Sequence, residues 1–474
     1  MKKWLPRFSS TSTPLNETVN RSLDKQVKLA VTGLSRSGKT VFITSLVHQL
    51  LHGLGTTTHL PFFQIASSGR LRGTKAMPQP DMHIPSFLYD SAIEQLCGDP
   101  PTWPKPTNGI SEIRLAIRYL SDNPFFKHLS PISTLYVDII DYPGEWLLDL
   151  PLLELEYEQW SEQIARACEI EPRLSLSKEW RIFLNNLNLA DEADETVMRQ
   201  AANLYTDFLH QCKQHGLSLL QPGRFTMPGD DLKDAPLLKF CPLLEIPQIP
   251  QNTYNENSLF AEMKKRYNSY KEHLVKKFYE EHFSSFDRQI ILADVLSAFN
   301  NGHATFVDMR DAINMVLKSF HYGKSGLFNK LFGGLKIDKM LFATTKADHV
   351  TPDQLPHLET FFQNMLATSH NNAIFEGVQT ETLALAAVKC TQAAYTMFEG
   401  KKISCIKGVP LKSDKPVALF PGEVPPNVPM PEEWVKGRFH FVEFKPPRLA
   451  NVHGGGLPHI RLDRALEFLL GDKF

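Results

Sequence analysis

The chain has 474 residues, 42% of them hydrophobic and 22% charged, with a formal net charge of −1 at pH 7. This length allows two or three domains with large cores, and the balanced charge argues against a nucleic-acid-binding protein. The six cysteines are scattered without a C-x-x-C pair, which argues against a disulfide framework or a zinc site. No run of about 18 apolar residues occurs, and the N-terminus lacks an apolar signal-peptide core, so we expect a cytoplasmic protein.

The first predicted elements flank a glycine-rich loop. Residues 1–25 are expected to be a flexible N-terminus, residues 27–32 ("VKLAVT") predict a strand, and residues 41–51 ("VFITSLVHQLL") predict a helix. Between them, "GLSRSGKT" at 33–40 matches G-x-x-x-x-G-K-[ST]. Between a strand and a helix, this pattern binds phosphate through backbone N–H groups and the start of the helix.

Each part of this loop has an expected role. Gly33 and Gly38 let the backbone curl around a phosphate, Lys39 reaches the β- and γ-phosphates, and the Thr40 hydroxyl ligates Mg²⁺. The pattern alone does not separate ATP, GTP and the substrates of kinases or sulfotransferases, and a glycine turn that binds nothing is the alternative. The complete set of expected contacts is Gly33, Ser35, Arg36, Ser37, Gly38, Lys39, Thr40 and Val41.

The next stretch is rich in Gly, Pro and polar residues and is expected to hold a mobile loop. A threonine is required there to complete the Mg²⁺ shell when a triphosphate is bound. We expect Thr107, in "WPKPTNG", to be that residue and to act in catalysis. Thr74, in "LRGTKAM", is the rival, although its distance from the following strand fits less well.

A second Mg²⁺-binding group follows the next predicted strand. Residues 134–140 ("TLYVDII") predict a strand, and "DYPGEW" comes directly after it. Asp141 stands at the strand end, where a carboxylate that holds Mg²⁺ through water is expected. Gly144 completes D-x-x-G, whose glycine N–H senses the γ-phosphate in GTPases. Glu145 occupies the position of the water-orienting glutamine of Ras, and because a carboxylate cannot donate a hydrogen bond, we expect slow hydrolysis.

Residues 150–286 are expected to be a helical insertion. Their apolar stripes must be buried against each other or against a neighbour, so we expect the insertion to pack as a lid beside the nucleotide. One stripe, in 194–216, consists of Val197, Ala201, Leu204, Phe208 and Cys212, and the other, in 257–283, of Phe260, Met263, Tyr267, Tyr270, Leu274 and Phe278.

Two further predicted strands lead to residues that would read the base. Residues 338–343 ("DKMLFA") precede "TTKADH", which is similar to the N/T-K-x-D motif of GTPases. Asp348 would accept hydrogen bonds from guanine N1–H and N2–H₂, which adenine does not offer there, while the Lys346 stem packs over the base. A plain loop before a helix is the alternative. The remaining expected contacts are His349 and, at the end of the predicted strand "TETLALAAV" (380–388), Ala387 and Val388.

The C-terminal third contains one unusual segment. After a strand at 288–296 and a helix at 304–320, residues 321–336 mix Gly and Lys with Leu and Phe. This segment is either a docked loop or an exposed contact for a partner protein or a membrane surface. From residue 401 we expect a small β element, with a strand at 439–444 ("FHFVEF"), and a final helix around 460–470.

The residue sequences of several motifs resemble those of the YcjX family of bacterial P-loop proteins. The resemblance covers nearly all of the chain and is carried most distinctively by "DYPGEWLLDLPLL" and "LDRALEFLLGD". It implies a Ras-like α/β P-loop core, with a mostly parallel sheet and helices on both faces, an inserted all-helical domain and a small C-terminal β-containing extension. It also implies GTP or GDP and Mg²⁺ as ligands, a stress response, and an unidentified effector or regulator. The expected divisions are 1–25, 26–149, 150–286, 287–400 and 401–474.

The source of positive charge for hydrolysis is left open. No arginine lies three residues before Thr107, where Gα carries one. The leading interpretation is a slow GTPase that acts as a conformational switch, and the alternatives are an ATPase or kinase-like enzyme and a guanine-nucleotide-binding scaffold that does not hydrolyse GTP. The candidate arginines are Arg36, Arg70, Arg72 and Arg224.

Overall fold

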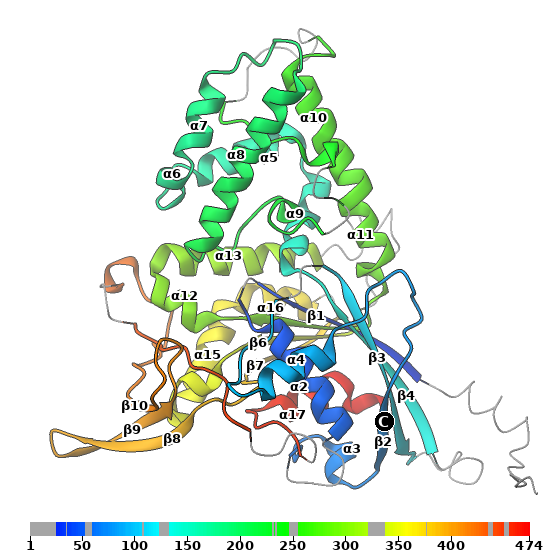
Figure 1. Ribbon diagram of the computed structural model, residues 1–474, viewed down its shortest axis with the longest axis vertical. Coiled ribbons are helices and arrows are strands. Elements are labelled where there is room, and N and C mark those ends of the chain that lie inside the picture. Colours follow the sequence, from blue (N-terminus) through cyan, green and yellow to red (C-terminus); the bar gives the residue numbers. More distant parts are fainter. Residues whose placement is uncertain are drawn as a thin grey trace, which may run out of the picture.

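The computed structural model describes most of the chain, and its central element is one seven-stranded sheet (Figure 1). The order of the strands is β2-β3-β4-β1-β5-β6-β7. Strands β4, β1, β5, β6 and β7 run parallel, while β3 is antiparallel to β4 and β2 to β3. The described residues are 25–34, 36–52, 59–106, 109–122, 132–229, 232, 235–245, 255–320, 337–375, 377–434, 439–449 and 455–474. The strands are β1 Lys25–Gly33, β2 Leu71–Met77, β3 Ser111–Leu120, β4 Ile132–Asp141, β5 Arg288–Ala293, β6 Lys339–Thr344 and β7 Gln379–Ala384.

The strand order places a ligand crevice at β1. The chain leaves β1, builds the strands on one side as far as β4, and then returns to the other side of β1 with β5. In open α/β sheets, ligands bind beyond the carboxyl ends of the strands at such a switch point. The glycine-rich loop begins where β1 ends, at this point.

Helices cover both faces of the sheet, so the central strands are buried on both sides. Alternate residues of β1 belong to different cores: Val27, Leu29 and Val31 pack with α2 and α17, whereas Ala30 faces the opposite cluster. All six residues of β5 are buried. The helices around the sheet are α2 Lys39–His52, α3 Gln64–Ser67, α4 Tyr89–Cys97, α12 Val295–Asn301, α13 His303–Phe320, α15 Leu355–Met365, α16 Ala367–Phe375 and α17 Leu462–Leu470.

Between β4 and β5, the regular elements in the described part of 144–285 are helices, stacked together at the top of Figure 1. They start with a 3₁₀ helix, η1, directly at the D-x-x-G glycine. These helices bury an aromatic cluster that includes Trp160, Trp180, Tyr205 and Tyr267. Their bounds are η1 Gly144–Glu154, α5 Tyr157–Ala167, α6 Arg173–Leu176, α7 Lys178–Asn185, α8 Glu195–Gln214, α9 Gly223–Thr226, α10 Leu259–Tyr270 and α11 Lys276–Glu281.

The two predicted apolar stripes are largely confirmed. Ala201, Phe208 and Cys212 of α8 are buried, as are the predicted aromatic residues of α10 and α11. Val197 and Leu204 of α8 are only partly buried. Leu274 is also only partly buried, because a π-helical turn at Lys271–Val275 joins α10 to α11. The extra residue of this turn rotates the stripe by one position, so Val275 faces the core instead.

The C-terminal region contains a three-stranded antiparallel sheet of β8 Gln392–Phe398, β9 Lys401–Gly408 and β10 Val417–Leu419. β8 therefore begins before residue 401, where the small β element was expected. The predicted strand at 439–444 is wrong: its one ladder contact is the bridge between Phe444 and Pro410. The Asn300 side chain instead binds both the backbone N–H and the carbonyl of Phe441, at 2.7 Å each. The final helix is confirmed as α17.

Candidate functional site

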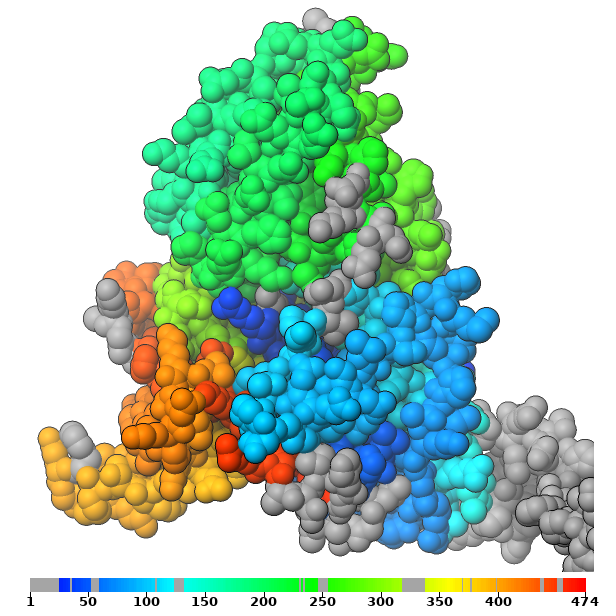
Figure 2. Space-filling model, in the orientation of Figure 1, coloured from blue at the N-terminus to red at the C-terminus, as the bar shows by residue number. Residues whose placement is uncertain are grey.

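A cavity of about 560 Å³ opens at the carboxyl edge of the sheet. Its wall combines the loops after β1, β6 and β7 with the turn after β4, residues 103–106, the helical region and the C-terminal loop. In Figure 2, dark blue surface of the N-terminal segment shows between the green helices above and the light-blue and orange surfaces below. The predicted residues that line the cavity are Gly33, Arg36, Ser37, Gly38, Lys39, Thr40, Val41, Glu145, Lys346, Asp348, His349, Ala387 and Val388.

The loop after β1 has the backbone of an anion cradle. Gly38 takes a φ of +80° and Arg36 a φ of +64°, and α2 begins at Lys39. The hydroxyl of Ser37 is buried and has no hydrogen-bond partner among the described residues. A buried, unsatisfied hydroxyl is costly, and a phosphate oxygen bound at the start of α2 would satisfy it.

The lysine of the loop and the carboxylate after β4 meet at one end of the cavity. The Lys39 ammonium lies 2.8 Å from Asp141 Oδ1 and also donates a hydrogen bond to the carbonyl of Tyr142. Asp141 is 1% exposed, and apart from the ion pair with Lys39 its oxygens have no partner among the described residues. A buried carboxylate suits a hard cation such as Mg²⁺, and the hydroxyl-bearing Thr40 follows Lys39 in the chain and lines the cavity, so these residues fit the expected metal.

The D-x-x-G turn lies against the loop after β1. A Cβ atom added to Gly144 would lie 2.2 Å from the carbonyl oxygen of Gly33, so only glycine fits at this position. Glu145 is 6% exposed and forms an ion pair with Lys213 of α8, with 2.8 Å between Lys213 Nζ and Glu145 Oε1. The negative charge of Glu145 is therefore balanced by the Lys213 ammonium.

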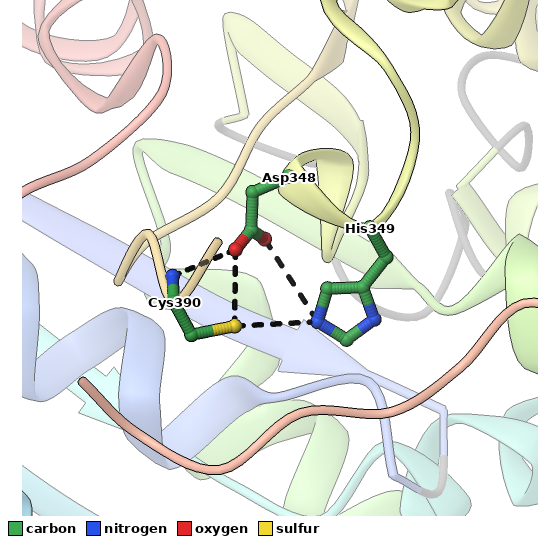
Figure 3. A group of neighbouring side chains, drawn as sticks. All are labelled: Asp348, His349 and Cys390. Atoms are coloured by element: carbon green, nitrogen blue, oxygen red, sulfur yellow. Dashed lines mark hydrogen bonds and ion pairs between the residues drawn. The ribbon is translucent and has the colours of Figure 1, made fainter. Parts of the chain in front are cut away.

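Asp348 lies at the other end of the cavity, with one carboxylate oxygen occupied and the other open. Oδ2 accepts hydrogen bonds from the backbone N–H groups of Cys390 (2.7 Å) and Thr391 (3.2 Å) and from the Cys390 thiol (3.0 Å). Oδ1 accepts none from the described residues, and the His349 Nε2 lies 3.9 Å away from it (Figure 3). The Asp348 side chain is 1% exposed, and Asp348 is one of the residues that line the cavity.

Lys346 is held by two carboxylates. It has a left-handed backbone conformation, with φ of +57°, and its ammonium pairs with Asp294 (2.6 Å) and Glu443 (2.7 Å). Burial lowers the pKa of Lys346, but these two carboxylates outweigh burial and raise the pKa overall. The ammonium is therefore held by two carboxylates, and Lys346 is one of the residues that line the cavity.

The thiol, imidazole and carboxylate near Asp348 also form a set that can ligate a metal. Single ligand atoms of Asp348, His349 and Cys390 all lie within 4.8 Å of one another and point toward a common centre (Figure 3). Zinc accepts these ligand types. Burial lowers the pKa of His349, which favours the neutral imidazole. A metal ion at this set and a guanine base would both bind the Asp348 carboxylate, so we expect the two ligands to compete.

Several sequence-predicted residues do not take their expected places. Thr74 pairs with Ile117 within β2 and β3 and does not line the cavity. Arg70 pairs with Asp122, and Arg224 stacks on the ring of Trp146 at 3.7 Å. Neither side chain belongs to the cavity wall. Ser35, Thr107 and residues 321–336 lie outside the described residues.

Sequence reasoning missed part of the wall. Trp103 lines the cavity, and its indole N–H donates to the carbonyl of Phe444 at 2.9 Å. Phe444 in turn meets the ring of His349 edge to face, with 5.1 Å between the ring centres. Lys213, Cys390 and Glu443 were also missed, because each comes from a segment without a recognisable motif.

Comparison with known proteins identifies the family to which nearly the whole chain belongs. Residues 27–474 match the YcjX-like family, DUF463. The chain is 44% identical to a protein of Escherichia coli K12 named Ras-like GTPase YcjX, over 97% of this chain and 98% of that protein. A protein of the same name from Shewanella oneidensis MR-1 is 40% identical over 96% of both chains. The chain therefore belongs to the YcjX-like family.

Proposed function

We propose that the protein binds GTP and GDP with Mg²⁺ in this cavity and slowly hydrolyses GTP to GDP and phosphate. The supporting observation is the cavity itself, with the phosphate-binding loop at one end and the open Asp348 oxygen at the other. Guanine carries two N–H donors that suit this oxygen, whereas adenine carries an acceptor at N1. The printed name of both relatives, Ras-like GTPase, agrees with this proposal.

Each end of the cavity has a defined task. Thr40 and Asp141 would hold Mg²⁺, which would supply positive charge to neutralise the triphosphate. Lys39 leaves Asp141 to meet the phosphates, Asp348 orients the base, and the stem of Lys346 covers it. Slow hydrolysis follows from Glu145, because a carboxylate cannot donate a hydrogen bond to the attacking water and adds negative charge beside the γ-phosphate.

The output would be a conformational switch. The D-x-x-G turn begins η1, to which the helical region is attached, so a change at Gly144 on γ-phosphate binding would move that region. We place this switch in the cytoplasm, in a bacterial stress response with an unidentified effector, as the family resemblance implies. None of the described helices is both long and apolar enough to cross a membrane.

Two alternatives are separated by one experiment on the purified protein with Mg²⁺. Binding of GTP, GDP, ATP and XTP is measured by competition with a fluorescent guanine nucleotide, and phosphate release is followed over several hours. The proposal predicts a preference for guanine nucleotides and slow phosphate release. Equal binding of ATP would contradict it in favour of an ATPase. Guanine-nucleotide binding without phosphate release would indicate a scaffold, which the Glu145–Lys213 pair favours.

A further inference from the structure

The helical region between β4 and β5 contributes a cation to the phosphate end of the cavity. Of the cavity-lining residues, Lys213 and Met227 come from the part of this region that follows η1. Lys213 lies in the last turn of α8, where the partial negative charge of the helix end favours a positive side chain. Its side chain is 24% exposed, and Lys213 is one of the residues that line the cavity.

The partner of this cation fixes its place relative to the phosphate loop. Lys213 Nζ lies 2.8 Å from Glu145, which follows Gly144 in the chain. Gly144 in turn touches the carbonyl of Gly33 so closely that a Cβ atom would not fit between them. The ammonium is therefore one ion pair away from the turn that packs on the phosphate-binding loop.

Attachment of the helical region does not require this ion pair. The Trp146 indole donates to the carbonyl of Met227 at 2.9 Å, and Asp149 accepts a hydrogen bond from the N–H of Gly223 at 2.7 Å. A Cβ atom added to Gly223 would lie 2.0 Å from the carbonyl oxygen of Glu145, so the two backbones are in direct contact. The ion pair is therefore one of several contacts between η1 and the rest of the helical region.

We propose that Lys213 contacts the γ-phosphate of bound GTP and stabilises the charge that develops there during hydrolysis, with Glu145 as its partner in the empty protein. This inference rests on the proposed GTPase function. The γ-phosphate carries more negative charge than one carboxylate, so the ammonium exchanges Glu145 for phosphate oxygens. Lys213 thereby fills the role for which the sequence offered only arginines, and Arg224 is excluded by its stacking on Trp146.

The hydrolytic step itself needs no proton from Lys213. The oxygen of water forms a bond to the γ-phosphorus while the bond to the β–γ bridging oxygen breaks, and the bridging oxygen keeps the electron pair. One water proton stays on inorganic phosphate and the other goes to solvent. The ammonium remains protonated throughout, and its contribution is electrostatic.

The test compares Lys213→Ala and Lys213→Arg with Lys264→Ala. Lys264 pairs with Glu158 in the same helical region, and its side chain is 26% exposed, but it does not line the cavity. We expect Lys213→Ala to lower single-turnover hydrolysis about 100-fold and to lose tight binding of GDP with aluminium fluoride, while GDP alone binds within twofold of wild type. Lys213→Arg should restore both properties in part, and Lys264→Ala should leave them unchanged.

A second variant separates this role from a structural ion pair. Glu145→Gln breaks the same pair but leaves the ammonium free and removes a negative charge. We expect it to bind GDP with aluminium fluoride more tightly than wild type, and the comparison stands even if Lys213→Ala folds poorly. Equal losses in Glu145→Gln and Lys213→Ala, or wild-type behaviour of Lys213→Ala, would overturn the inference. Failure of the wild type to bind guanine nucleotides would instead overturn the proposed function.

Discussion

Asp149 is a buried carboxyl group between the D-x-x-G helix and the helical region. It is 2% exposed and accepts hydrogen bonds from the N–H of Gly223 and the hydroxyl of Tyr270. Burial raises its pKa from 3.8 to about 7, although its two hydrogen bonds and the nearby Arg224 partly oppose this. The folded protein therefore holds a proton on this group more tightly than the unfolded chain does.

This difference in pKa predicts how the free energy of unfolding depends on pH. Because the folded pKa is raised, the stability contributed by the protonated group is present below about pH 4 and is lost as the pH rises to about 7, by up to about 1.4 kcal/mol per unit. Asp149→Asn removes this titration. The difference in free energy of unfolding between Asp149→Asn and wild type should therefore shift in favour of the variant from pH 5 to pH 7.5. Urea denaturation at both pH values measures this. The exposed Asp311→Asn serves as control, and a parallel pH profile for Asp149→Asn and wild type would contradict the assignment.

At the residue scale, the sequence predicted those groups of the site that lie in motifs. Lys39 follows the loop after β1, and Asp141 ends the neighbouring parallel strand β4, so the sheet brings the two predicted residues together. Lys213 and Glu443 could not be predicted in the same way. Each is one charged residue on a segment distant in sequence, and only the packing of that segment brings it to the cavity.

At the scale of elements, η1 is held to the helical region along most of its length. Glu145 binds Lys213, Trp146 binds the carbonyl of Met227, and the Gln221 side chain donates to the carbonyl of Leu148. η1 also begins at Gly144, against the phosphate-binding loop. The phosphate-binding loop and the rest of the helical region are therefore connected through η1.

Gly223→Ala tests this connection. The new Cβ atom would lie 2.0 Å from the carbonyl oxygen of Glu145, so the segment has to move away from η1. Overpacking of this kind costs about 1–3 kcal/mol, and we expect a loss of stability in that range by chemical denaturation. At Gly73 of β2 a Cβ atom meets nothing within 4 Å, so Gly73→Ala is the matched control. Equal stability of the two variants would show that η1 tolerates separation from the loop.

Helices with strong periodicity were predictable, and irregular backbone was not. The stripe of α8 follows directly from its spacing, but the π-helical turn before α11 leaves no mark in the pattern. The region after α2 was expected to hold a mobile loop, and no strand was predicted in it, yet it contains β2 and β3. β2 lies at the sheet edge and is mostly exposed, so it shows no apolar alternation, whereas Ile113, Leu115, Ile117 and Tyr119 of β3 did carry a usable signal.

For the molecule as a whole, the end of the chain closes the core of the sheet. Leu462, Leu466, Leu469 and Leu470 of α17 are buried in the cluster that contains the apolar face of α2 (Figure 1). Asp472 then pairs with Arg288 of β5 at 2.7 Å and with Lys339 of β6 at 2.8 Å. The last residues therefore join the core built by the first strand and helix.

Leu466→Ala measures how much this closure contributes. Removal of a fully buried leucine side chain costs about 2–5 kcal/mol when the cavity cannot collapse, and we expect a loss of that size in the free energy of unfolding. Leu88 is 75% exposed, so Leu88→Ala is the same chemical change without burial and should cost little. A loss below about 1 kcal/mol for Leu466→Ala would mean that α17 only covers the sheet.

The central claim is that this cavity holds a guanine nucleotide read by Asp348. The most direct measurement is competition binding of GTP and XTP to wild type, Asp348→Asn and the exposed Asp353→Asn. We predict that Asp348→Asn shifts the preference from GTP toward XTP by about 10- to 100-fold, because an amide donates to the xanthine carbonyl. Asp353→Asn should behave as wild type. If Asp348→Asn leaves the preference unchanged and ATP competes as well as GTP, Asp348 does not read the base and the account fails.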